Sequence, residues 1–307
     1  MIIIENHFND VDTVDYASLP RDTVIYANII SNGCQTFPIE QLDEVCQEFN
    51  VPDYVKQDVI DAFEENKDAD DVNEDIFDKL QELNNRTLNH AVAFATKNQN
   101  LLKKLLVSAD MELRDIIASR EILSDDLVHQ LAKDENPHVR TMIARRKDLP
   151  NSILVELSFD PDWMVRANIA KKDNLPLSII ECLSRDEDAY VRRHIAMRND
   201  LNETIIEQLA KDNDVEIRRI LAGKENLSDS LMSELAKDSK HLVREAVAKN
   251  KTLNEQLIEE LSNDPDLIVR SAIALRKDLS DTIIQKLAND QDPLVRQVII
   301  DRQHNLL

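Results

Sequence analysis

Aspartate and arginine recur at a fixed spacing, and these are the residues whose types and positions could do chemistry. Seven aspartates are each followed six residues later by an arginine, and both columns repeat every 26 residues. A guanidinium offers several donors in a rigid fork, so it can bond a carboxylate inside a fold or, if it faces outward, the phosphates of a nucleic acid. The pairs are Asp134 and Arg140, Asp160 and Arg166, Asp186 and Arg192, Asp212 and Arg218, Asp238 and Arg244, Asp264 and Arg270, and Asp290 and Arg296.

A second column is basic in six of seven copies, and we call it the basic column. It lies six residues after the arginines and consists of Arg146, Lys172, Arg198, Lys224, Asn250, Arg276 and Arg302. Arg193 and Arg219 add positive charge nearby. Two interpretations remain open. In the first, the cations stabilise the C-terminal end of a helix through its dipole. In the second, they form a strip that binds a partner.

The repeated region contains one tryptophan and one tyrosine, and they lie in neighbouring copies. Trp163, Tyr190 and His194 fall in neighbouring copies at positions that vary elsewhere, close to Arg193. Such residues often dominate the energy of binding, although they can equally fill a gap between repeats. We therefore include Trp163, Tyr190, Arg193, His194 and Arg219, with Arg146, Lys172, Arg198, Lys224 and Arg276 of the basic column, as candidate partner-binding residues.

Signals of catalysis and of cofactor binding are absent from the sequence. The seven histidines form no HExxH motif and no cluster with cysteine, and the three cysteines show no CxxC spacing. With only two glycines the chain has no phosphate-binding loop and no dinucleotide fingerprint. We expect no enzymatic activity, no catalytic residues, no metal and no cofactor.

A 26-residue repeat must position these columns. Leucine recurs at 123, 149, 175, 201, 227, 253 and 279, and again eight residues after each of these. An eighth, degenerate copy begins near residue 97. Within a copy, a residue that favours helix starts, Ser, Asn or Pro, precedes one apolar stripe. The aspartate-rich tract then forms a turn before a second apolar stripe with a small alanine. Each copy is therefore predicted to be two short helices that bury their stripes only by stacking on the next copy.

The pattern Leu-x3-Leu-x3-Leu-Ala-x-Asp-x4-Val-Arg-x2-Ile-Ala over 123–144 resembles the leucine-rich repeat variant, a relative of HEAT and armadillo repeats. The resemblance spans about 97–304 and implies a binding scaffold, with the Asp and Arg columns forming a hydrogen-bond ladder between repeats. It also implies that the second helices, with the basic column, line the concave surface. Some members carry a cysteine-rich iron–sulfur segment, which Cys34 and Cys46 alone do not supply. The predicted fold is an all-α, right-handed solenoid of about eight two-helix repeats with a helical N-terminal cap.

Charge divides the chain into two regions. Residues 1–85 hold 21 acidic and 4 basic residues, whereas residues 86–307 hold 38 and 33. We expect 1–85 to be a mainly helical cap or an acidic docking region, and 86–307 to be the solenoid. Reduced thiols and the lack of a long apolar run indicate a cytoplasmic protein without a membrane segment.

Two functions remain open from the sequence. The first is a non-catalytic scaffold that binds a protein or peptide on the concave face. The second is a nucleic-acid binder that uses the basic column, with the acidic N-terminus as a regulator or as a mimic of nucleic acid. Nucleic-acid binding would weaken steeply with salt.

Overall fold

The computed structural model describes residues 98–107, 109–225 and 227–303, together with Asn89, Ala93 and Thr96. The chain divides into two compact units, Met1–Leu149 and Pro150–Leu307, and each is described by itself. The region 1–85, predicted to be a helical cap or docking module, lies outside the described residues.

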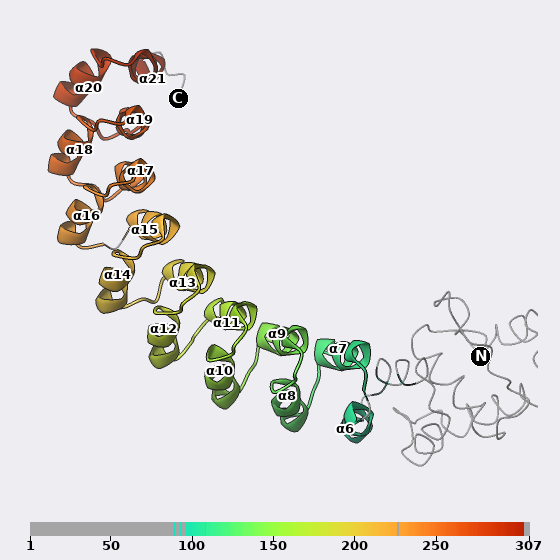
Figure 1. Ribbon diagram of the computed structural model, residues 1–307. Coiled ribbons are helices and arrows are strands. Elements are labelled where there is room, and N and C mark those ends of the chain that lie inside the picture. The colour runs from blue at the N-terminus through green and yellow to red at the C-terminus, as the bar shows by residue number, and fades with distance from the viewer. Residues whose placement is uncertain are drawn as a thin grey trace, which may run out of the picture. The chain divides into compact units, whose positions relative to one another are not determined.

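The described residues form sixteen α-helices and no strand, which confirms the predicted all-α repeat fold (Figure 1). They make eight pairs, and the pairs recur with the 26-residue period. The first unit contains α6 (Gln99–Val107), α7 (Met111–Ser119), α8 (Asp125–Leu131) and α9 (Pro137–Arg145). The second contains α10 (Asn151–Ser158), α11 (Trp163–Ala170), α12 (Leu177–Leu183), α13 (Ala189–Ala196), α14 (Glu203–Leu209), α15 (Val215–Ala222), α16 (Asp229–Leu235), α17 (His241–Lys249), α18 (Glu255–Leu261), α19 (Leu267–Ala274), α20 (Asp281–Ala288) and α21 (Pro293–Gln303).

Side-chain caps explain where many of these helices begin. Before α14 and α18 the side chains of Asn202 and Asn254 accept a hydrogen bond from the backbone N–H three residues on. The odd-numbered helices start differently, because the last residue of the aspartate-rich turn is their cap. Asp162 and Asp188, for example, accept from the backbone N–H two residues later. Both helices of a pair have such caps in α14–α15 and α18–α19, whereas Pro150, Pro176 and Lys240 make no side-chain cap bond before α10, α12 and α17.

In the Pro150–Leu307 unit the helices form two layers. Neighbouring odd-numbered helices pack against each other and against the even-numbered helices, and Figure 1 shows the odd-numbered layer on the inner side of the unit's curve. Ala170, Ala196, Ala222, Ala248 and Ala274 end the buried stripe of successive odd-numbered helices, and each is 0% exposed. The small side chain lets successive helices approach closely, as the sequence predicted.

We expect Ala222→Leu to destabilise the protein by about 1–3 kcal/mol, because added methylenes in a packed contact force neighbouring side chains out of place. The adjacent Gly223→Ala is the matched control. A Cβ built on Gly223 would meet only backbone oxygens of its own helix, the nearest at 3.5 Å. This control should be neutral or stabilising by up to about 1 kcal/mol. Urea denaturation followed by circular dichroism checks both, and equal stability of the two variants would contradict the packing argument.

Candidate interaction surface

The arginine column bonds the aspartate column of the next repeat. In α11 the Arg166 Nε and Nη2 atoms donate to the two carboxylate oxygens of Asp186, at 2.6 and 2.8 Å. This bidentate geometry suits a planar guanidinium and a carboxylate. The same two bonds, 20 residues apart in sequence, join Arg192 to Asp212, Arg218 to Asp238, Arg244 to Asp264, and Arg270 to Asp290.

Each aspartate also organises the turn of its own repeat. The carbonyl oxygen of Asp186 accepts a bond of 2.7 Å from Arg192 Nη1, and its carboxylate accepts the Asp188 backbone N–H at 2.9 Å. Arg140 and Arg296 donate in the same way to the carbonyl oxygens of Asp134 and Asp290. With Arg166 and Arg270 at 7% and 5% exposure, these guanidinium groups have a structural position and do not present a surface for phosphates.

The basic column forms a second ladder that sequence analysis missed. Its side chains reach back to the backbone carbonyl at the equivalent position of the preceding repeat. Arg276 Nη1 bonds the carbonyl oxygens of Asn250 and Ala248 at 2.6 and 2.9 Å. Lys224 Nζ bonds the Arg198 carbonyl at 2.5 Å, and burial lowers its pKa. The remaining bonds of this kind join Arg146 to Arg120, Arg198 to Lys172, Asn250 to Lys224, and Arg302 to Arg276.

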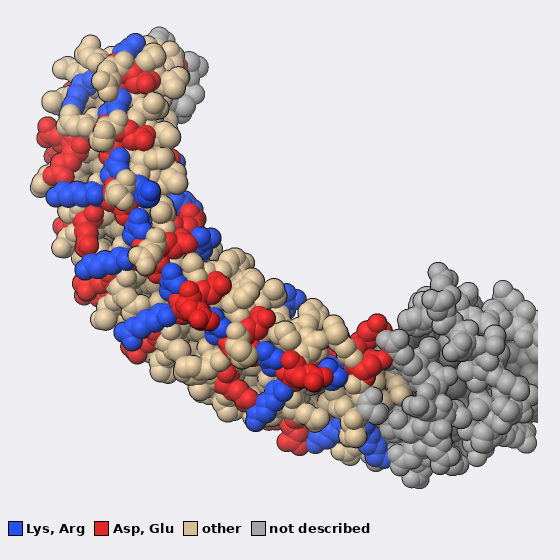
Figure 2. Space-filling model, viewed as in Figure 1, with Lys and Arg blue, Asp and Glu red and all other residues tan. Residues whose placement is uncertain are grey.

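This geometry corrects the expected placement of the basic column. We expected Arg146, Lys172, Arg198, Lys224 and Arg276 to line an open concave strip. The described bonds instead direct four of these head groups into the stack, at the carbonyls that the C-terminal ends of helices leave unpaired. Lys172 supplies one of the acceptor carbonyls. On the face of Pro150–Leu307 seen in Figure 2, acidic and basic side chains alternate and neither sign forms a continuous tract.

The aromatic residues do come together, and we call Trp163, Tyr190 and His194 the aromatic cluster. The Trp163 and Tyr190 rings meet edge to face with centroids 5.3 Å apart, and Tyr190 meets His194 in the same manner at 4.7 Å. The ammonium of Lys171 lies 5.7 Å from the centre of the Tyr190 ring. Trp163 and Tyr190 remain 40% and 44% exposed, so the cluster is a surface feature that joins α11 to α13.

The two remaining candidate arginines are held by nearby carboxylates. Arg193 Nη2 lies 2.6 Å from an Asp214 carboxylate oxygen, and this hydrogen bond raises the pKa of Arg193. Arg219 pairs with Glu216 one turn earlier in α15, which raises the pKa of Arg219 and lowers that of Glu216. Both arginines lie on odd-numbered helices, as does the aromatic cluster.

Sequence analysis also missed a row of exposed apolar side chains. It occupies the second position of the odd-numbered helices, just ahead of the buried stripe. We call it the apolar row; it consists of Met164, Tyr190, Leu242, Ile268 and Leu294, which are between 41% and 62% exposed. Glu216 takes this position in α15. Its signal in the sequence is five apolar residues among the seven full copies, with His138 and Glu216 as the exceptions, at a position directly before the buried valine or isoleucine.

The described residues hold no group of three or more His, Cys, Asp or Glu side chains that could bind a metal ion. In the same part of the chain, the Cys182 thiol is free and its pKa is raised by burial, and no helix is long and apolar enough to cross a membrane. A cytoplasmic location and the lack of enzymatic activity remain predictions.

Comparison with known proteins supports the repeat fold. The chain is similar to a solved structure described as a leucine-rich repeat variant with a novel repetitive protein structural motif. The two share 29% sequence identity with a TM-score of 0.56, over 67% of this chain and 82% of that one. No protein-family model and no curated protein matches the chain. The chain is thus a helical repeat protein like the leucine-rich repeat variant, as its sequence pattern indicated.

We expect Asp290→Asn to lower the free energy of unfolding by about 1.5–3 kcal/mol at pH 7, the range for hydrogen bonds to charged groups. The hydrogen bond from Arg270 lowers the pKa of Asp290. Its stabilisation is therefore complete above the unfolded-state pKa of about 3.9 and is lost as the pH falls toward the folded-state value. Urea denaturation of the wild type and the variant at several pH values should show their difference shrinking below about pH 4.

Asp278→Asn is the control for this prediction. Asp278 pairs with Arg276, but its side chain is 53% exposed, so we expect a loss below about 1 kcal/mol. An equal loss in the two variants, or a difference from wild type that grows toward acid pH, would contradict the role given to the buried pair.

We expect the pKa of His194 to lie below the ordinary histidine value of about 6.5. Burial lowers it first, and the charge of Lys171 lowers it further. NMR titration of the imidazole should show this, and Lys171→Gln should move the midpoint upward because it removes the like charge. Lys237→Gln, which removes a charge beside the end of α16, is the control. A midpoint at or above 6.5 in the wild type would sink the prediction.

Proposed function

We propose that the protein is a non-catalytic interaction scaffold, and that it binds a protein or peptide on the exposed face of its odd-numbered helices in Pro150–Leu307. We call this face the inner face. A helical repeat fold in general suggests interaction with proteins, because stacked units expose one long continuous surface. The choice of the inner face and of a protein or peptide as its ligand is what we propose.

The observation that carries the proposal is the apolar row. Its five members lie on α11, α13, α17, α19 and α21. None of them is needed to fill the core, because the next residue of each helix, such as Val165 or Val191, is already 0% exposed there. Exposed apolar residues that gather on one face are typical of interaction sites. The aromatic cluster adds Trp163 and His194 beside Tyr190, and Trp and Tyr are enriched at binding hot spots.

Nucleic-acid binding, the alternative from the sequence, has no such support. It depends on cations that face outward and release counterions from phosphates. In the described residues the arginine column bonds aspartates and carbonyls, and most of the basic column bonds carbonyls. Nucleic-acid binding is therefore one outcome of the capture experiment described next.

Affinity capture from a native lysate, with and without nuclease, tests the proposal. We expect a partner protein to be captured even after nuclease treatment. The Leu242→Asp variant should recover at least about fivefold less of this partner than the wild type. This substitution places a charge in the apolar row, and burying an unpaired charge in an interface is costly. The captured proteins are quantified by mass spectrometry.

Leu177→Asp is the matched control. Leu177 is also an exposed leucine in the first turn of a helix, at 49% exposure against 43% for Leu242, but it belongs to the even-numbered α12. Capture should be unaffected by it. A capture that disappears with nuclease, or that the two variants reduce equally, would overturn the proposal.

A further inference from the structure

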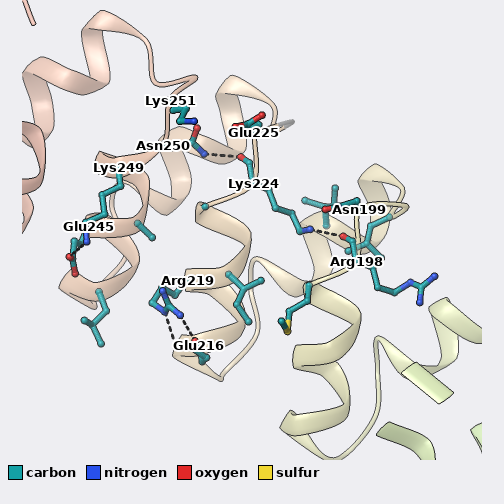
Figure 3. A pocket seen from close by; sticks show the side chains of 17 residues that line it. Arg198, Asn199, Glu216, Arg219, Lys224, Glu225, Glu245, Lys249, Asn250 and Lys251 are labelled. Carbon is teal, nitrogen blue, oxygen red and sulfur yellow. Dashed lines mark hydrogen bonds and ion pairs between the residues drawn. The ribbon is translucent and has the colours of Figure 1, made fainter. Parts of the chain in front are cut away.

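A groove lies on the inner face between the ends of three odd-numbered helices, and we call it the Gly223 groove. It encloses about 1090 Å³ and is lined by the exposed faces of α15 and α17 and by the segment after α13 (Figure 3). Pockets that take small ligands have volumes of about 300–1,000 Å³. The groove is therefore large enough to accept several side chains of a peptide.

A missing side chain contributes to the hollow. At the position of Gly223 the preceding repeat carries Met197 and the following one carries Lys249, and both line the groove. Nothing in the fold requires glycine here. The backbone of Gly223 is right-handed helical, with φ −81°, and an added Cβ would meet only ordinary contacts. The gap is thus open surface, and a long side chain at this position would enter it.

Apolar side chains form part of the groove wall. Met197 is 59% exposed and Leu242 is 43% exposed, and Ile220 and Ala246 lie on the same exposed faces of α15 and α17. Leu242 also belongs to the apolar row. The groove can therefore take an apolar side chain of a partner, and its burial would contribute about 25 cal/mol for each Å² removed from water.

Charges at the groove are unevenly distributed. Five cations and three acids line it, in a chain whose net charge is −22. Three of the cations already pair with carboxylates: Arg198 pairs with Asp200, which lies outside the groove lining, and the other two pair within their own helices. Arg219 pairs with Glu216, and the Lys249 ammonium lies 2.5 Å from the Glu245 carboxylate (Figure 3).

Two lining cations have no carboxylate partner in the part of the chain that the structure describes, and both follow the C-terminal ends of helices. Lys224 lies two residues after α15 and donates to the Arg198 carbonyl, and Lys251 lies two residues after α17, with Glu225 as the acid at this end. Within the part of the chain that the structure describes, exposed Lys251 makes no hydrogen bond or ion pair. This end of the groove therefore favours a negatively charged group.

We infer that the Gly223 groove binds a peptide segment of a partner protein in which an apolar side chain is flanked by carboxylates. The apolar side chain enters the gap over Gly223, beside Met197 and Leu242. The carboxylates lie at the end of the groove where Lys251 is exposed. This inference rests on the proposed scaffold function, for which it names a site and a class of partner.

Selection from a random peptide-display library on the full-length protein tests the inference. Enriched peptides should carry a large apolar residue next to Asp or Glu. A synthetic, fluorescein-labelled copy of the leading peptide should bind in fluorescence anisotropy, and its affinity should fall with salt because the groove charges are open to solvent.

Two pairs of variants locate the binding. Gly223→Met, which fills the gap with the side chain of the preceding repeat, should weaken the labelled peptide at least about tenfold, whereas Gly223→Ala should change its affinity less than about twofold. Lys251→Glu should weaken it about threefold or more, since an exposed pair is lost and a like charge is added. Lys277→Glu makes the same change at the equivalent position of the next repeat, outside the groove, and should have little effect. Thermal unfolding verifies that each variant is folded.

Three results would overturn the inference. They are enriched peptides without carboxylates, equal binding to wild type and Gly223→Met, or no enrichment above the display background. None of them decides the scaffold function, which the lysate capture tests separately. Peptides that bind Gly223→Met but are lost with Tyr190→Ala would place the site at the aromatic cluster and would leave the scaffold proposal standing.

Discussion

The bidentate bond between an arginine and the aspartate of the following repeat is the interaction on which this structure depends. Arg192, for example, bonds both carboxylate oxygens of Asp212 and, with Nη1, the carbonyl oxygen of Asp186. One side chain thereby connects its own turn to the next. Both partners are almost buried, with side chains 16% and 9% exposed. The same geometry recurs from Arg166 to Arg270, and a constant spacing of 26 residues brings each of these arginines to the next aspartate.

That constraint leaves the exposed positions of the odd-numbered helices free to vary. The buried stripe and the two ladders use most of the repeating residues, and the inner face is what remains. In α13 it carries Tyr190 and His194, in α15 it carries Glu216 and Arg219, and in α19 it carries Ile268. A scaffold of this kind maintains its fold through periodic residues, and its specificity is expected from the aperiodic ones.

The sequence predicts the periodic part of this structure well. The leucine period indicated the repeats, the helix starts indicated the pairs, and Ala196 and its equivalents indicated close packing. The surface was harder to predict for a physical reason. A residue that departs from its column can reflect neutral sequence change or a role in binding, and the repeat pattern does not distinguish these two causes. Gly223 occupied a position where other copies carry long side chains, which was the one available signal of the groove.

The basic column shows why charge in a sequence is a weak guide to binding. Asn250 replaces arginine or lysine there, yet its side-chain amide bonds the carbonyl oxygens of Ala222 and Lys224 at 2.9 and 2.7 Å. Arg276 bonds the equivalent pair one repeat later. The column therefore requires a hydrogen-bond donor and not a positive charge, and a neutral amide meets this requirement while only 4% exposed. The electrostatic character of the inner face is consequently set by the positions outside the columns, such as Lys251 and Arg219.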